Sequence, residues 1–249
     1  MTGSDVACVR AVVRKELRDY RRKRSIVAAM IILPVIFLIE PVVTIFLIPG
    51  TTSGSSLDSY VVFPLLYLLL IPVVTPSAVA AYSIVGEREQ GTLEPLLTTP
   101  IRRQAFILGK AVAVMIPALG LSYLVFGLFL GAVALFANPA VAAAVFHQGA
   151  VILALCLFTP LLAGWAVLVG MAASVRASEV RVAQQLGMLA SLPPLGVVAL
   201  LALGVIDATF PVAVLFAVGL LAMDVLAMRV VSRMFDRERL VTGAKAARS

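Results

Sequence analysis

The chain has 249 residues, of which 61% are hydrophobic and only 13% are charged. Soluble domains carry about 25% charged residues, so this composition, with a mean hydropathy of +1.07, excludes an ordinary soluble domain and indicates a membrane protein. The net charge of +7 comes from basic residues beside apolar runs, which favours the inner surface of a membrane over nucleic acid as a partner.

Residues 1–24 are predicted to form a cytosolic amphipathic helix that lies in the inner membrane interface. The apolar residues at helical spacing are Val9, Val13, Leu17 and Tyr20, and the basic residues on the other side are Arg10, Arg14, Arg18 and Arg21. Such a helix is attracted to anionic lipids through its basic face. The alternative left open by this pattern is a basic tail that only fixes the topology.

Six apolar stretches follow, each long enough to cross about 30 Å of hydrocarbon as a helix of about 20 residues. The predicted spans are residues 25–49, 60–85, 104–137, 150–173, 184–206 and 210–230. They predict an all-α integral membrane protein with a transmembrane domain over residues 25–230 and a cytosolic tail over residues 231–249. Residues 138–149, between the third and fourth spans, are themselves apolar and either lie along the outer interface or dip into it.

The basic residues predict which side each connection faces. All 20 Lys and Arg residues lie in residues 1–24, in residues 86–110, between the fourth and fifth spans, or from Arg229 onward. The three connections that alternate with these contain none. By the positive-inside rule, this distribution places both termini in the cytosol.

Prolines inside two of the spans predict kinks, because each proline removes a helical hydrogen bond. They are Pro64, Pro72 and Pro76 in the second span, and Pro193 and Pro194 in the fifth. The sequence leaves open whether these kinks flex or are static.

The connection after the second span is unusually polar and structured for a simple loop. Residues 86–100 read GEREQGTLEPLLTTP. Gly91 can end the helix that emerges from the second span, and Thr92 is a candidate cap for a short helix that follows. Pro100 suits the first turn of the next helix. The short helix would have an apolar face made of Leu93, Leu96 and Leu97, which a mere connector does not need.

The stretch GEREQGTLEPLLTTPIRRQAFILGK resembles the cytosolic signature of type-2 ATP-binding-cassette (ABC-2) permeases, and the stretches RVAQQLGMLASLPPLG and FDRERL support the resemblance. The resemblance implies the permease subunit of an exporter in a bacterial plasma membrane. Two permease chains, identical or related, would sit above two copies of a cytosolic ATPase, and residues 86–103 would be the coupling segment. The ATPase-coupling residues implied are Glu87, Glu89, Gly91, Thr92, Leu93, Glu94, Leu96, Leu97 and Pro100.

The chain is not predicted to be an enzyme or to bind a cofactor or metal. The pair Gly109-Lys110 fails the P-loop pattern, because position 104 is Gln and position 111 is Ala. The resemblance therefore assigns ATP and Mg²⁺ to the partner ATPase.

Glu40, within the first span, is a candidate pathway residue, because an intramembrane carboxylate is costly and often functional. Counting about 1.5 Å per residue from Arg24 puts it about 24 Å along the helix, near the outer interface. Two alternative functions stay open: a secondary transporter or channel that needs no ATPase, and a membrane scaffold subunit. A secondary transporter normally uses buried ionisable groups, for which Glu40 is the only deep candidate away from the ends of the spans.

Overall fold

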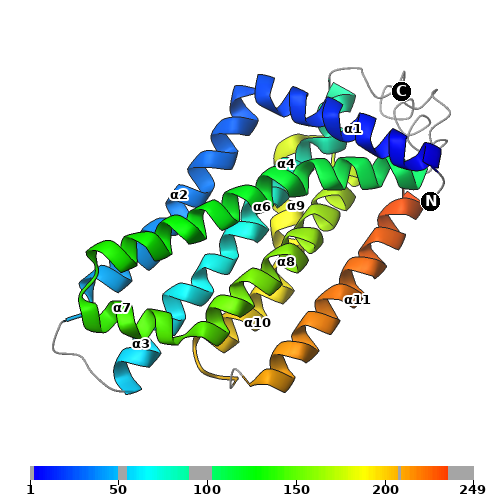
Figure 1. Cartoon of the computed structure of the whole chain (residues 1–249). Helices are drawn as coiled ribbons and strands as arrows, with labels where there is room; N and C mark the ends of the chain where they lie inside the picture. The colour runs from blue at the N-terminus through cyan, green and yellow to red at the C-terminus, as the bar shows by residue number, and fades with distance from the viewer. Residues whose placement is uncertain (1–2, 50–54, 90–102, 207–208, 235–249) are drawn as a thin grey trace.

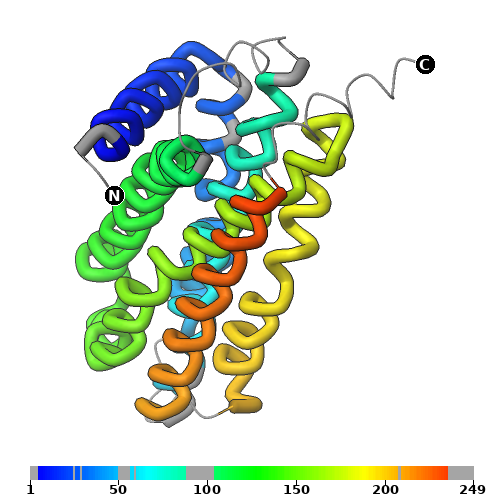
Figure 2. The backbone as a smooth tube through the Cα atoms, turned by 90° about the vertical axis from the view of Figure 1, so that its right-hand side faces the viewer, coloured from blue at the N-terminus to red at the C-terminus, as the bar shows by residue number. Residues whose placement is uncertain are grey.

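The computed structural model describes residues 3–49, 55–89, 103–206 and 209–234, and every regular element in these ranges is helical. The predicted all-α fold class is therefore confirmed. Long helices run side by side in one bundle, and α1 (Gly3–Arg22) lies across one end of it (Figure 1). Seen from the side, α1 and the first part of α6 (Arg103–Phe136) pack together at that end (Figure 2).

Six stretches of the described chain have the length and composition to cross a membrane, if one bent pair of helices counts as a single span. Alongside α6, the continuous ones are α2 (Arg24–Leu47), α3 (Ser55–Tyr67) joined through η1 (Leu68–Leu70) to α4 (Ile71–Glu89), α8 (Gly149–Arg176) and α11 (Phe210–Met234). The bent pair is α9 (Val180–Ala190) and α10 (Leu192–Ala202), which meet at 44°.

The second and fifth spans, for which the sequence predicted kinks, both depart from a regular straight helix, whereas α2 stays one continuous helix although it contains Pro34 and Pro41. The second span passes through the 3-10 turn η1 immediately before Pro72. The fifth span bends at Ser191, just ahead of Pro193 and Pro194. Proline cannot donate a backbone hydrogen bond and its ring crowds the preceding turn, so the helix changes direction where prolines cluster.

The central helix of the bundle is α4, which packs chiefly on α8 and also touches α2, α6 and α9. Gly170 of α8 makes this contact close, since a Cβ there would lie 2.8 Å from the Cβ of Ala80 and 3.1 Å from the carbonyl of Ser77. Small residues at such crossings let membrane helices gain van der Waals contact, which is a main source of attraction between helices in lipid.

A short helix, α7 (Pro139–His147), lies across the end of the bundle opposite α1 (Figure 1). The Asn138 side chain caps it by accepting the Ala140 N–H at 3.0 Å. Its nine residues span about 13 Å, which is too short to cross a membrane. It packs on α3, and its buried residues include Val141 and Val145, so it lies along this end of the bundle.

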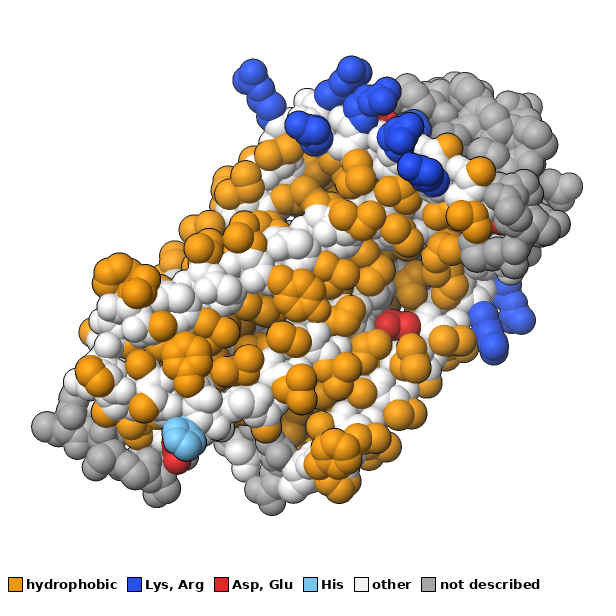
Figure 3. Space-filling model, in the orientation of Figure 1, with side chains coloured by type: hydrophobic (Ala, Val, Ile, Leu, Met, Phe, Trp, Pro, Cys, Tyr) orange, Lys and Arg blue, Asp and Glu red, His pale blue; other side chains and the backbone are white. Residues whose placement is uncertain are grey.

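Basic side chains gather at the end of the bundle where α1 lies. On the face shown in Figure 3, Lys and Arg side chains lie along α1 and beside the neighbouring end of α11, while the middle of the bundle is mostly apolar, with an acidic side chain visible on it. This segregation is the pattern from which the cytosolic position of that end is predicted.

Candidate functional site

The predicted coupling segment, residues 86–103, lies partly within the described chain. Residues 86–89 complete α4 and Arg103 begins α6, whereas residues 90–102 lie outside the described residues. The predicted coupling residues outside the described ranges are Gly91, Thr92, Leu93, Glu94, Leu96, Leu97 and Pro100. What the structure describes is the pair of helix ends on either side of this segment and the contacts that hold them.

Lys110 is the centre of a buried charge cluster that joins three helices. Its side chain is 0% exposed, and its Nζ lies 3.1 Å from Oε1 of Glu16 and 3.0 Å from Oε1 of Glu87. The same nitrogen donates to the carbonyl of Ser83 at 2.7 Å. Hydrogen bonds to Glu16 and Ser83 use two of the three N–H donors of the ammonium group, and Glu87 adds an ion pair. Glu16 comes from α1, Glu87 from α4 and Lys110 from α6, so one side chain ties these three helices together.

Lys15 closes the cluster from its exposed side. Its Nζ lies 3.1 Å from Oε1 of Glu87 and 3.5 Å from Oε1 of Glu16, and its side chain is 46% exposed. Partial burial opposes the charge of Lys15, but the two carboxylates outweigh it, so the pKa of Lys15 is raised. With two lysines and two glutamates, the cluster is electrically neutral, as a buried group of charges requires.

Tyr20 packs beside this cluster on the buried side of α1. Burial first, and then the negative charge of Glu16, raise the pKa of Tyr20 well above its ordinary value. Its hydroxyl is buried without a well-directed hydrogen bond among the described residues. Tyr20 therefore stays neutral at physiological pH and helps to exclude water from the charged groups.

Gly109 lets α1 approach α6 closely, next to Lys110. A Cβ at position 109 would lie 2.8 Å from the Cβ of Val12 and 3.4 Å from the carbonyl of Val9. Real Cβ contacts are essentially never as short as the first of these, so glycine is the residue that fits at this spacing. The Gly109-Lys110 pair, which fails as a P-loop, is thus the place where α6 meets α1.

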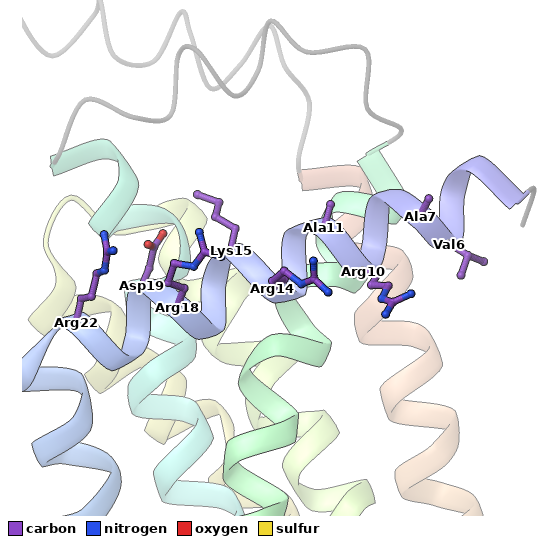
Figure 4. Close-up of a pocket in the computed structure, with 9 residues that line it drawn as sticks. All are labelled: Val6, Ala7, Arg10, Ala11, Arg14, Lys15, Arg18, Asp19 and Arg22. Carbon is purple, nitrogen blue, oxygen red and sulfur yellow. The ribbon is translucent and has the colours of Figure 1, made fainter.

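The buried face of α1 is rotated from the one expected from the sequence. The buried residues of α1 are Asp5, Val12, Glu16 and Tyr20, whereas Val9, Val13 and Leu17 are half-buried. The rotation brings Glu16 to Lys110. It also leaves the basic side of the helix exposed, as predicted, and an open groove of ≈ 840 Å³ runs along it between the side chains of Arg10, Arg14 and Arg18 (Figure 4).

Of the predicted coupling residues within the described chain, Glu87 is turned inward. It is 9% exposed and pairs with Lys110 and Lys15. Glu89 is the last residue of α4. Sequence reasoning did not single out Glu16, and it noted Lys110 only as the end of the family-like stretch and in the rejected P-loop pair. The two residues are 94 positions apart. The available signals were a carboxylate in the middle of an amphipathic helix and a lysine inside an apolar run.

A hydroxyl from α8 contacts the backbone of α4 shortly before the charge cluster. The Ser174 Oγ donates to the carbonyl of Ala81 at 2.6 Å and accepts from the N–H groups of Ile84 at 3.2 Å and Val85 at 3.0 Å. In a regular helix the Val85 N–H donates to the Ala81 carbonyl. One serine therefore lies at a rung of the α4 hydrogen-bond ladder and fixes the end of α4 to α8.

The candidate pathway residue Glu40 lies on α2, apart from the cluster. Its Oε1 accepts a hydrogen bond from Thr44 at 2.8 Å, and its Oε2 is buried without a hydrogen-bond partner among the described residues. Within the same ranges, no group of three or more His, Cys, Asp or Glu side chains is placed to hold a metal ion.

The fold is that of a multi-pass membrane protein built from apolar helices. A family model described as "ABC-2 family transporter protein" matches residues 10–232, from α1 to the end of α11. The chain therefore belongs to the ABC-2 family of transporter proteins, as the stretch GEREQGTLEPLLTTP indicated, and it is a membrane transport component rather than a catalytic one. No curated protein matches the chain in a sequence search.

Proposed function

We propose that the chain is the membrane-spanning permease subunit of an ABC transporter, driven by a separate cytosolic ATPase through residues 86–103. Family membership supports the transport role. The charge cluster supports the proposal that movement of the ATPase reaches the spans through residues 86–103. An ion pair of 3.0 Å between Oε1 of Glu87 and Nζ of Lys110 joins α4 to α6, the two helices on either side of residues 90–102. A displacement of the segment therefore reaches α4 and α6 together, and α4 is the central helix of the bundle.

The contact with the ATPase is assigned to the short helix expected within residues 90–102. Its apolar residues Leu93, Leu96 and Leu97 would fill a groove of the ATPase, where buried apolar side chains supply most of the binding energy. Glu94 would face basic residues at the rim of that groove, which favours the correct orientation more than it adds affinity. ATP and Mg²⁺ bind to the ATPase in this arrangement.

The working unit is proposed to contain two permease chains, identical or related, and two ATPase subunits. Two helices leave long apolar faces uncovered in the single chain. Along α11 the buried residues are Leu220 and Val231, and along α2 the apolar side chains of Ile32, Val35, Ile36 and Ile39 are exposed. Lipid and a second permease chain can share these faces, and a pathway between two chains is wider than one within six spans.

The same proposal places the protein in a bacterial plasma membrane, as an exporter, by analogy with the family. The arginine side of α1 then lies on the inner leaflet, where each basic residue near an anionic surface contributes about 1 kcal/mol of attraction. The apolar spans suit a hydrophobic or amphipathic substrate.

The test is reconstitution of the chain with the ATPase encoded beside it. We expect the two proteins to co-purify, and inverted vesicles to accumulate a hydrophobic dye or a fluorescent phospholipid only when ATP is hydrolysed. An ATPase variant without its P-loop lysine is the matched control and should abolish accumulation. Accumulation by the permease chain alone would instead favour a secondary transporter or channel, for which Glu40 is the candidate residue.

A further inference from the structure

The contact between α1 and α6 is more elaborate than an anchor for an interfacial helix requires. A helix that only rests on the membrane surface needs an apolar face and a basic face. Here α1 instead turns a carboxylate, Glu16, into the protein, where it meets a lysine that is 0% exposed. Burial of charged groups costs free energy unless every group is paired, so attachment of α1 alone does not require this arrangement.

The cluster lies close in sequence to both ends of residues 90–102. Glu87 lies three residues before residue 90, and Lys110 lies eight residues after residue 102, so the cluster contains one residue from each of the two helices that flank residues 90–102. At about 1.5 Å per helical residue, these separations correspond to about 4 Å and about 12 Å. Glu16 joins α1 to both ends at the same point.

Beside Lys110, α1 and α6 also pack closely against each other. Gly109 and Val12 bring the α6 and α1 backbones so close that any Cβ at position 109 would clash. Phe106 covers the ammonium group, with its ring centroid 5.2 Å from Nζ of Lys110, so the cluster is shielded by an aromatic face. Charge pairing and close packing at one spot resist both sliding and separation of the two helices.

The connection between α1 and α2 is very short. Only Lys23 separates the two helices, and its N–H is shared between the carbonyls of Asp19 at 3.2 Å and Tyr20 at 3.1 Å. With so short a connection, α1 cannot move far without moving the start of α2. The first span is therefore connected, through α1, to the helices that flank the coupling segment.

We propose that the Gly109-Lys110 pair makes α1 a working part of the coupling device. The end of α4, the start of α6 and all of α1 move as one body, and α1 passes this movement to α2. Lys110 is a positioning residue in this scheme, because it acts through Glu16 and Glu87 and does not touch substrate. The inference rests on the proposed function, in which an ATPase displaces residues 90–102.

The first test separates transport from ATP hydrolysis. Lys110→Met removes the buried ammonium group that pairs with both Glu16 and Glu87, so α1 should loosen from α6. We expect membrane insertion and ATPase binding to persist, while substrate carried per ATP falls about ten-fold, within the range typical of coupling between sites. Glu16→Gln, which keeps the shape and a hydrogen-bond acceptor, should give a smaller fall in the same direction. Arg229→Gln, which removes an exposed charge on α11, is the control and should carry substrate as the wild type does.

The second test asks whether α1 and α6 stay together during the cycle. Cysteines introduced as Val12→Cys and Gly109→Cys, in a chain carrying Cys8→Ser and Cys156→Ala, can be joined by a disulfide after a small adjustment. If the helices move as one body, oxidation should leave ATP-driven transport at the level of the same cysteine chain in its reduced form, and should restore coupling to the Lys110→Met chain. Loss of transport on oxidation, regained on reduction, would show that the two helices must separate and would overturn the proposal.

A third measurement distinguishes failure of this inference from failure of the proposed function. In the isolated chain without ATPase, the cysteine pair should oxidise more slowly once Lys110→Met is added, since α1 then spends less time against α6. An unchanged oxidation rate argues against the cluster as the tie between these helices, whatever drives transport. Transport by the wild-type chain that does not depend on ATP would instead overturn the proposed function.

Discussion

Ser174 on α8 and Ala81 on α4 are joined by a hydrogen bond of 2.6 Å from a side-chain hydroxyl to a backbone carbonyl. The same oxygen accepts the N–H groups of Ile84 and Val85, so a single serine bridges one turn of α4. Glu87 follows within two residues. The helix that leads to the coupling segment is therefore fixed on one side by α8 and on the other by the charge cluster.

Replacing Ser174 with alanine should destabilise the protein by about 1–3 kcal/mol, the usual cost of leaving buried polar groups without a partner. Thermal unfolding of the purified protein in detergent measures this. Ser122→Ala is the matched control, because the Ser122 hydroxyl is equally buried but donates only to the Ala118 carbonyl of its own helix. Equal melting temperatures for the two variants would contradict a bridging role for Ser174.

Gly170 should tolerate no side chain, because an added Cβ would lie 2.8 Å from Ala80 and 3.1 Å from backbone of Ser77. Overpacking of this kind typically costs about 1–3 kcal/mol, so Gly170→Ala should lower the melting temperature. Gly120→Ala is the comparison, since a Cβ on Gly120 meets nothing within 4 Å. That variant should be neutral or slightly stabilising, because alanine favours the helix more than glycine does.

The double change Leu96→Asp and Leu97→Asp should release the ATPase, because charged side chains cannot fill an apolar groove. A pull-down of the ATPase with the tagged permease chain measures this, with membrane insertion checked in the same sample. Leu96→Met with Leu97→Met keeps the apolar character and should retain binding. Retained binding by the aspartate variant would move the contact to another part of the permease.

The attachment of α1 should weaken at strongly alkaline pH. In an unfolded chain tyrosine loses its proton near pH 10, whereas the pKa of Tyr20 in the folded protein is higher. The folded state therefore binds this proton more tightly, and the resulting stability is full below about pH 10 and is lost as the pH rises through the folded pKa. The raised pKa of Lys15 acts in the same direction.

Melting temperatures measured between about pH 7 and pH 11 test this expectation. They should stay level up to about pH 9 and fall above about pH 10, and Tyr20→Phe should make the fall shallower. Tyr60→Phe, at an exposed position on α3, is the control and should follow the wild-type curve. A fall already present near neutral pH would mean that other groups hold α1 in place.

The sequence alone predicted the helical class, the six apolar stretches, the kinks at the proline clusters and the family. These features are local. In lipid, the backbone N–H and C=O groups of a span must form their hydrogen bonds within the helix, and the span itself is a run of about 20 apolar residues. The break at Ser191 follows from Pro193 and Pro194 in the same way. The polar stretch that begins at Gly86 stands out for the same reason, since its composition differs from that of the runs on both sides.

Only the tertiary structure brought Glu16, Glu87 and Lys110 to one point, and it did so by rotating α1 away from the face that its apolar residues suggested. A helical repeat shows which residues share a side of one helix, but not which distant side chain that side will meet. The pairing depends on how closely the helices approach, and Gly109 against Val12 sets that distance. Contacts across 94 residues of chain leave no periodic trace in the sequence, because packing in three dimensions creates them.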